Sequence, residues 1–236
     1  MKLLAFDTST DTMRIAVQHG EQVFTHSGAG GAQASSTLIP AIQALMSQAG
    51  LQFSQLDAIA FGRGPGSFTG LRTACSVAQG LAFAAGVKVL PVDTLHALAH
   101  EAHSQCQATR ICAALDARMG EMYFAYYTFD SCSRNIYAGY SLKTPENMDL
   151  AEDFEATTLA GNVRPVYDAL LPAAVLAAPY VACLPSATAM LRLAPQLIAG
   201  GGLVEPQDAL PLYVRDKVAL TTAEREDVAA AKARAA

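Results

Sequence analysis

Short apolar runs alternate with segments of helical periodicity along the first half of the chain, which is the pattern of an α/β fold. This pattern predicts strands over residues 3–6, 12–18, 22–26, 56–61 and 87–92. The first three of these strands form a meander. Apolar residues spaced three or four apart predict helices between them, over residues 36–49, 69–86 and 94–104. Strands and helices in this order favour a layered sheet with helices on its faces.

The second half of the chain opens with a copy of the first hairpin. Residues 3–7 match residues 112–116, and residues 13–17 match residues 122–126, both at a spacing of 109 residues. A strand ending in Asp, a turn and a second strand thus occur twice. We expect two related lobes whose acidic strand ends, Asp7 and Asp116, face a shared cleft; chance similarity between two hairpins is the alternative.

A glycine-rich turn follows the apolar run that ends at Phe61. Residues 62–72 read GRGPGSFTGLR, in which glycines permit close backbone approach and Pro65 fixes one backbone angle. Ser67 or Thr69 can cap the helix that follows. A glycine turn before a helix can bind phosphate, but the P-loop lysine is absent, since no lysine occurs between Lys2 and Lys88.

Small residues recur every fourth position along the helix behind this turn, at Gly70, Ala74, Ala78, Ala82 and Gly86. A ridge without side-chain bulk lets another element approach closely. The ridge packs either on the chain's own sheet or against a helix of another chain. The preceding helix has an apolar stripe of its own, formed by Leu38, Ile42, Leu45 and Ala49.

Composition narrows the class of protein. The 236 residues are 52% hydrophobic and 16% charged, enough to bury a core, and no apolar run is long enough to span a membrane. The N-terminus lacks the layout of a signal peptide, and five widely spaced cysteines without a CxxC pair favour reduced thiols in the cytoplasm. A net charge of −5 without a basic cluster argues against autonomous nucleic-acid binding.

Two turns carry candidate acid chemistry. Asp7 and Thr8 begin a turn that resembles the first phosphate-binding turn of actin-like ATPases, although both residues can simply satisfy the end of the strand. The turn from Asp116 to Glu121 places two carboxylates beside Arg118. This turn either performs acid–base work or satisfies itself through Arg118, and we favour the second interpretation.

Three histidines share one face of the predicted third helix. His96, His100 and His103 lie at positions i, i+4 and i+7, with Cys106 one turn further. Imidazoles four residues apart can share a metal, but no fourth ligand is evident nearby. We therefore expect a solvated histidine face and no bound metal, with His96 and His100 as the only candidate ligands.

Residues 62–72 resemble the signature of the TsaB (also called YeaZ) family, which is needed to make threonylcarbamoyladenosine in tRNA. Residues 4–10, 116–123 and 211–215 resemble other segments of that family, whereas residues 127–205 fit poorly. The signature turn itself comprises Gly64, Pro65, Gly66, Ser67, Phe68 and Thr69.

The resemblance implies an actin/Hsp70-like (ASKHA) α/β fold with duplicated RNase H-like lobes, the second reduced. We expect lobes at residues 1–108 and 109–221 and a frayed or disordered charged tail at 222–236. The implied role is a non-catalytic partner of the TsaD threonylcarbamoyltransferase. The implied interface on the first-lobe helices comprises Leu38, Ile42, Leu45, Gly70, Arg72, Ala74, Ala78 and Ala82.

The resemblance also implies further partners: a TsaE-like ATPase, a second copy of the chain, and tRNA only through the complex. No cofactor is expected for the isolated chain, and a nucleotide only at a partner interface. Ala34 stands where the family often has a histidine, and His96 and His100 lie near the place of the HxxxH motif of TsaD. The alternatives are an actin-like ATPase or phosphotransferase using Asp7 and Asp116, or a metallopeptidase using these histidines.

Overall fold

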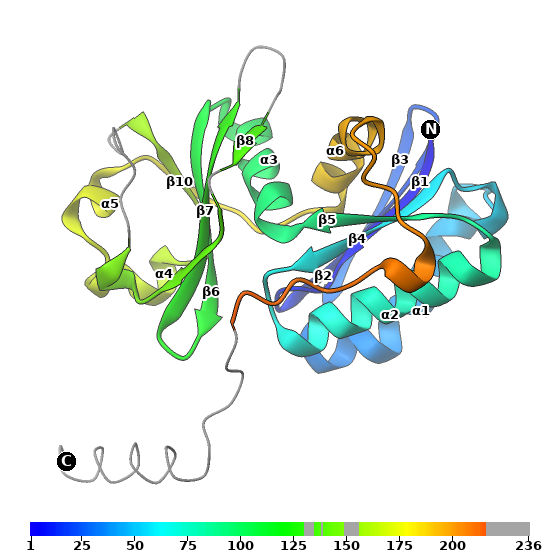
Figure 1. The fold of residues 1–236 in the computed structure, drawn as a ribbon, viewed down its shortest axis with the longest axis horizontal. Helices are drawn as coiled ribbons and strands as arrows, with labels where there is room; N and C mark the ends of the chain where they lie inside the picture. Colours follow the sequence, from blue (N-terminus) through cyan, green and yellow to red (C-terminus); the bar gives the residue numbers. More distant parts are fainter. Residues whose placement is uncertain (130–134, 138, 149–155, 216–236) are drawn as a thin grey trace, which may run out of the picture.

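A computed structural model describes residues 1–129, 135–137, 139–148 and 156–215, which form two lobes (Figure 1). The first lobe contains a five-stranded sheet with strand order β3-β2-β1-β4-β5. Strand β2 is antiparallel to its neighbours, whereas β1, β4 and β5 are parallel. The strands are β1 (Lys2–Asp7), β2 (Thr12–His19), β3 (Gln22–Ala29), β4 (Ala58–Gly64) and β5 (Val89–Asp93).

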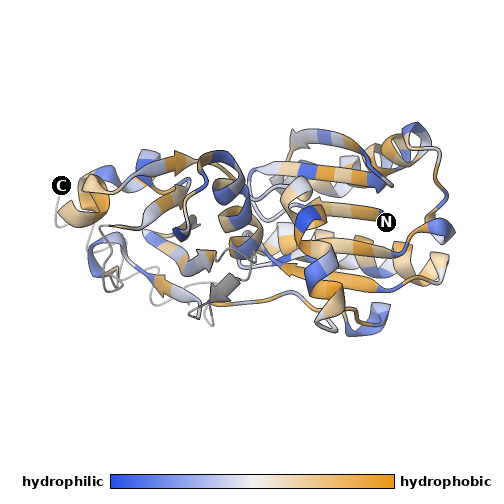
Figure 2. Ribbon diagram, turned by 90° about the horizontal axis from the view of Figure 1, so that it is seen from above, coloured by the Kyte–Doolittle hydropathy of each residue, from blue (hydrophilic) through white to orange (hydrophobic). Residues whose placement is uncertain are grey.

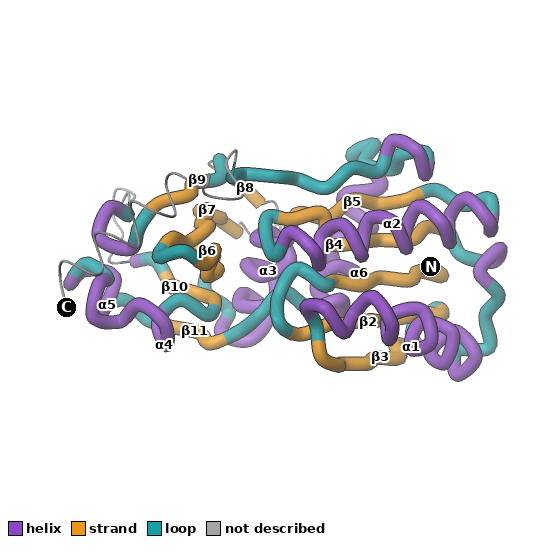
Figure 3. The backbone as a smooth tube through the Cα atoms, turned by 90° about the horizontal axis from the view of Figure 1, so that it is seen from below, coloured by secondary structure: helices purple, strands orange, loops and turns teal. Residues whose placement is uncertain are grey.

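Helices cover both faces of this sheet. Helices α1 (Ala34–Gln48) and α2 (Phe68–Ala85) lie side by side on one face (Figure 3). The other face carries α3 (Thr94–Cys106) and α6 (Ala187–Ala199). Short 3-10 turns occur at Gly31–Gln33, Phe53–Gln55 and Pro206–Asp208.

The second lobe repeats the arrangement of the first, with strand order β11-β10-β6-β7-β8 and β9 also paired with β7. Its strands are β6 (Arg110–Arg118), β7 (Glu121–Phe129), β8 (Asn135–Tyr137), β9 (Ser141–Lys143), β10 (Thr158–Gly161) and β11 (Tyr180–Ala182). Its outer helices, α4 (Arg164–Tyr167) and α5 (Ala173–Ala177), have only four and five residues. The expected duplicated RNase H-like fold with a reduced second lobe is therefore confirmed.

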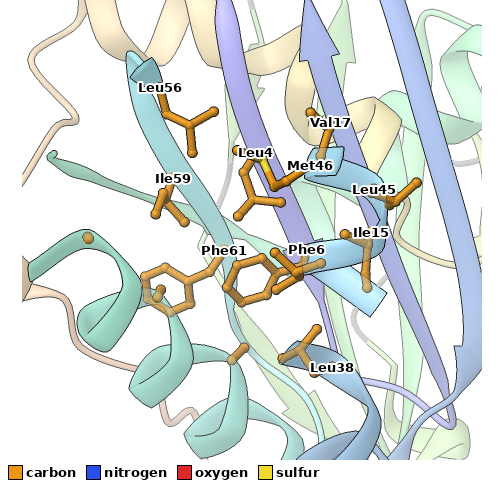
Figure 4. Packing of buried hydrophobic residues seen from close by; sticks show 14 of the residues in the cluster. Leu4, Phe6, Ile15, Val17, Leu38, Leu45, Met46, Leu56, Ile59 and Phe61 are labelled. Atoms are coloured by element: carbon orange, nitrogen blue, oxygen red, sulfur yellow. The ribbon is translucent and has the colours of Figure 1, made fainter. Parts of the chain in front are cut away.

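The main core lies between the first sheet and helices α1 and α2, and the strands of this lobe are largely hydrophobic (Figure 2). Phe6 and Phe61 pair across β1 and β4, and their rings lie next to each other above Leu38 (Figure 4). Both rings are fully buried. Burial of each such side chain contributes about 1.5–3 kcal/mol to stability.

The stripe of small residues on α2 belongs to this core. Ala74, Ala78 and Ala82 are fully buried against the sheet, as are Leu38 and Ile42 of α1. Leu45 is also buried, and Gly70 is enclosed by the turn that follows β1. The ridge therefore packs on the chain's own sheet, and these residues are not available as a partner surface; only Arg72 and Gly86 of the positions considered are exposed.

The chain returns to the first lobe after the second sheet. Helix α6 packs on the first sheet, Val204 pairs with Val89 of β5, and Cys75 and Gln79 of α2 donate to the Ala209 carbonyl at 3.1 and 2.9 Å. The expected division at residue 108, which assigned these residues to the second lobe, is thus corrected by long-range packing. The expected tail at 222–236 lies outside the described residues.

None of the helices in the described part of the chain is both long and apolar enough to cross a membrane.

Candidate functional site

A cavity of about 360 Å³ opens between the lobes. Its walls come from all four segments that resemble the TsaB family, at residues 9–11, 66–68, 115–119 and 212–215, together with Leu71, Tyr123 and Asn162. Segments far apart in the sequence therefore meet at one place, which makes this cavity the candidate functional site.

The glycines of the signature turn allow it to enclose the turn after β1. A Cβ atom at Gly62 would lie 1.8 Å from Asp7 Oδ2, and one at Gly66 would lie 2.6 Å from Ser9 Cβ. Both distances are too short for any side chain. The Ser67 amide donates to the Ser9 carbonyl at 2.8 Å, which joins the two turns through the backbone. The glycines are thus explained by close packing of two turns at the wall of the cavity.

Asp7 is fully buried and does not line the cavity. Its Oδ1 atom accepts from the amide and hydroxyl of Ser9 at 2.9 and 2.6 Å, and the Thr94 hydroxyl lies 3.5 Å from Oδ2. Burial raises the pKa of the Asp7 carboxyl, against the opposing effect of these hydrogen bonds. Asp7 and Thr8 thus form hydrogen bonds that hold the end of β1 in place, which agrees with the second of the two interpretations given for this turn.

Asp116 does line the cavity. The face of the second sheet on which Asp116 lies, however, does not correspond to the face of the first sheet on which Asp7 lies. Asp7 lies beside Thr94 of α3, whereas Asp116 accepts from the Tyr167 hydroxyl of α4 at 2.7 Å. Leu4 of β1 packs beneath α1 and α2, and Cys112 of β6 packs on the corresponding face of the second sheet. Structurally equivalent residues are therefore 108 positions apart and not 109. A shift of one residue along a strand moves every side chain to the other face of the sheet. The expectation that both acids face a shared cleft is therefore wrong for Asp7.

The charged side chains of the turn between β6 and β7 are all paired, partly within the turn and partly with residues outside it. Arg118 Nη1 lies 3.4 Å from Asp116 Oδ2, and Arg118 also pairs across the cavity with Asp11 of the first lobe. Glu121 pairs with Arg215, whose Nη2 also donates to the Arg118 carbonyl at 3.2 Å. The self-satisfying interpretation therefore holds for Arg118 and Asp116, whereas Glu121 takes its partner from outside the turn.

An aromatic cluster at the mouth of the cavity was not expected from the sequence. The rings of Phe68 and Tyr213 lie 5.3 Å apart, and the Arg72 guanidinium covers the Phe68 ring at 3.7 Å. Arg72 also donates to the Tyr213 hydroxyl at 3.1 Å. Asn162, likewise unexpected, accepts from the Asp116 amide at 2.9 Å. The sequence analysis singled out Phe68 and Arg72 in the signature region and placed Tyr213 in a segment with family resemblance, but it did not predict that the three side chains meet.

The histidines of α3 pack against aromatic residues of β7. His96 stacks on Tyr127 with ring centroids 5.4 Å apart, and His103 stacks on Phe129 at 4.3 Å. His100 lies between them, and its buried Nδ1 atom has no hydrogen-bond partner. Burial lowers the pKa of His100 to about 4. The expected solvated face is therefore wrong, since these rings form part of the contact between α3 and the second sheet.

No group of three or more His, Cys, Asp or Glu side chains arranged to hold a metal ion occurs within the residues that the structure describes. The metal-binding hypothesis for His96 and His100 thus receives no support from the arrangement of neighbouring ligands.

Comparison with known proteins gives consistent relatives. The family model described as "TsaD: tRNA N6-adenosine threonylcarbamoyltransferase" matches residues 25–233. The tRNA threonylcarbamoyladenosine biosynthesis protein TsaB of Escherichia coli K12 is 32% identical over 225 residues, covering 93% of this chain and 96% of the relative. The Haemophilus influenzae protein of the same name is 43% identical over 126 residues, or 53% of each chain.

A solved structure agrees with these sequences. YeaZ from Pseudomonas aeruginosa superposes with a TM-score of 0.82 at 37% identity, covering 90% of this chain and 99% of that chain. The long family match, the full-length relative and the shared two-lobed fold lead to one conclusion. The chain belongs to the TsaB (YeaZ) family of tRNA threonylcarbamoyladenosine biosynthesis proteins.

Proposed function

We propose that this chain is a non-catalytic subunit that binds and activates a TsaD-like threonylcarbamoyltransferase through the exposed faces of α1 and α2. The observation that carries the proposal is the lack of charge on these two helices. The 15 residues of α1 contain no charged side chain, and the 18 residues of α2 contain only Arg72. A helix face that remains in water usually carries charged residues, so an uncharged pair of neighbouring helices favours a protein interface.

The exposed residues of these helices support the same proposal. Phe83 of α2 is 80% exposed and Ile39 of α1 is 41% exposed, although both are large and apolar. Gly80 has open space around the position of a Cβ atom, which leaves room for close approach by a partner helix. The buried stripe then acts as the support that holds the helices on the sheet, and the docking surface lies on their outer side.

The arrangement of the two candidate acids, both within the described residues, supports a non-catalytic role. Asp7 is buried with its Oδ1 atom bonded to Ser9, and Asp116 is bonded to Tyr167 and Arg118. An ATPase that used both acids would need them to face one nucleotide, and only Asp116 lines the cavity. Titration of the isolated chain with Mg·ATP tests this alternative, and tight binding that Asp116→Asn removes would favour it.

Other partners follow from the same proposal. A second copy of the chain would compete with the TsaD-like protein for the α1 and α2 surface, because both contacts use the same helices. A TsaE-like ATPase would join the assembled pair. With a net charge of −5, the chain reaches tRNA only through the complex.

The test introduces bulk and charge on the exposed face. We expect Gly80→Arg and Phe83→Glu to weaken binding to the TsaD-like protein by about tenfold or more, because they place a charge in a desolvated contact. Val166→Glu on α4, where Val166 is 53% exposed, is the matched control and should leave binding unchanged. Calorimetry measures the affinity, and thermal melting verifies the fold. Unchanged affinity in both folded α2 variants would place the contact elsewhere.

A further inference from the structure

A second cavity, of about 190 Å³, lies between strands β2 and β3 and the start of α6. It shares no lining residue with the cavity between the lobes. Arg14 and Ile15 of β2 form one side, Thr25, His26 and Ser27 of β3 a second, and residues 186–188 the third. Neither the family resemblance nor the proposed docking surface accounts for this group of residues.

Arg14 is unusually placed for a charged residue. Its neighbours Met13 and Ile15 point into the core beneath α1, so Arg14 shares the opposite face with Ala16, which packs in the cluster beneath α6. The Nε atom of Arg14 is buried and has no hydrogen-bond partner. A guanidinium is always charged and has five donors, so an unsatisfied buried donor destabilises the empty site.

Two acids on the same side of the first sheet, Asp7 and Glu101, accept hydrogen bonds from other groups. Asp7 stands directly opposite Arg14 in the β1–β2 pairing, and the Arg14 charge acts against burial on the pKa of Asp7, but no hydrogen bond or ion pair joins the two side chains, and Asp7 Oδ1 accepts from Ser9. Glu101 of α3 lies at the start of α6, where its Oε2 atom accepts from Ser186 and Arg192. Other arginines do make ion pairs, among them Arg63, Arg118, Arg164, Arg192 and Arg215. Among the residues described, Arg14 has no such partner.

We propose that this cavity binds a small phosphate-type oxyanion, held by the Arg14 guanidinium. Arginine donates strong charge-assisted hydrogen bonds to such an anion. The hydroxyls of Thr25 and Ser27, which pair with Ala16 and Arg14 and share their face of the sheet, and the hydroxyl of Thr188 supply further donors around the same space. Ala187 lies at the remaining wall, and the Nε atom of Arg14 is shielded from solvent. The site is independent of the α1 and α2 docking surface.

The test titrates inorganic phosphate into the full-length protein at constant ionic strength, with chloride as the balancing anion. We expect saturable one-site binding by calorimetry and a melting temperature that rises with phosphate concentration, because a ligand of the folded state stabilises it. Arg14→Gln should weaken the affinity by about tenfold or more, since it removes the charge and most donors. Arg72→Gln, which alters an exposed arginine outside this cavity, should retain the affinity.

A second variant covers the case in which Arg14→Gln does not fold. Thr25→Val alters an exposed residue of the cavity wall, and a reduced affinity for phosphate with unchanged affinity in Arg72→Gln supports the site. Undetectable binding of millimolar phosphate to the wild-type protein overturns the proposal. Equal binding of acetate, or full retention of affinity in a folded Arg14→Gln variant, overturns it as well.

Discussion

Thr8, directly after strand β1, and Gly70, in the first turn of helix α2, are in close contact. The Thr8 hydroxyl donates to the Gly70 carbonyl at 2.7 Å. In the other direction, a Cβ atom at Gly70 would lie 1.8 Å from the Thr8 carbonyl oxygen. Two backbone segments 62 residues apart in sequence thus touch directly, and only glycine permits that contact.

The first prediction concerns this contact. Gly70→Ala should destabilise the protein by about 2 kcal/mol or more, because a methyl group must displace backbone that has no room to move. Gly80→Ala, in the same helix, has no atom within 4 Å of the new Cβ and should stabilise the protein by about 0.5–1 kcal/mol. Urea unfolding measures both changes. Equal effects of the two substitutions would show that the close approach to Thr8 carries no energetic weight.

The second prediction concerns the buried stripe. Ala78 is fully buried in the core, so Ala78→Arg should destabilise or unfold the isolated chain, at a cost of about 3 kcal/mol or more. Ala84→Arg places the same side chain on the exposed side of α2 and should change stability by less than about 0.5 kcal/mol. Thermal melting of the isolated protein distinguishes them. A folded Ala78→Arg variant of normal stability would contradict the packing of α2 on the sheet.

The third prediction compares two arginine pairs at the cavity. The side chain of Arg215 is 14% exposed and bonds Glu121 and the Arg118 carbonyl, so Arg215→Ala should cost about 1.5–3 kcal/mol. The pair of Arg118 with Asp11 joins the lobes through exposed side chains, and Asp11→Asn should cost less than about 1 kcal/mol. Denaturant unfolding measures both. A larger loss for Asp11→Asn would mean that the exposed pair holds the lobes together.

The fourth prediction concerns acid stability. Because burial lowers the pKa of His100 to about 4 from 6.5, the unfolded chain takes up this proton before the folded protein does. The contribution of His100 to stability is complete above pH 6.5 and is lost as the pH falls through 4. After allowance for partial solvent screening, the loss amounts to no more than about 2 kcal/mol.

Unfolding free energies measured between pH 7 and pH 4 check this prediction. His100→Leu should flatten the curve across that interval. An identical slope in wild type and His100→Leu would assign the acid sensitivity to other groups.

Local patterns in the sequence were sufficient for the strands and helices of the first half of the chain and for the hairpin that opens the second half. Apolar runs such as residues 56–61 have the period and length of buried strands, and the contiguous glycine signature at 62–72 is specific enough to indicate the family. The repeated hairpin likewise predicted a duplicated fold, because both copies preserve the same order of apolar and acidic residues.

Only the tertiary structure decided which side of each element meets a neighbour. The sequence showed a bare ridge on α2, but small residues suit a contact with either the chain's own sheet or a foreign helix, and packing chose the sheet. A register difference of one residue turned Asp7 away from the cavity and Asp116 toward it. Residues 187–209 joined the first lobe through contacts with the sheet, α2 and β5, which are distant in sequence. Which face of an element is buried depends on the summed energy of contacts between residues distant in sequence, and a local pattern of residues does not contain that information.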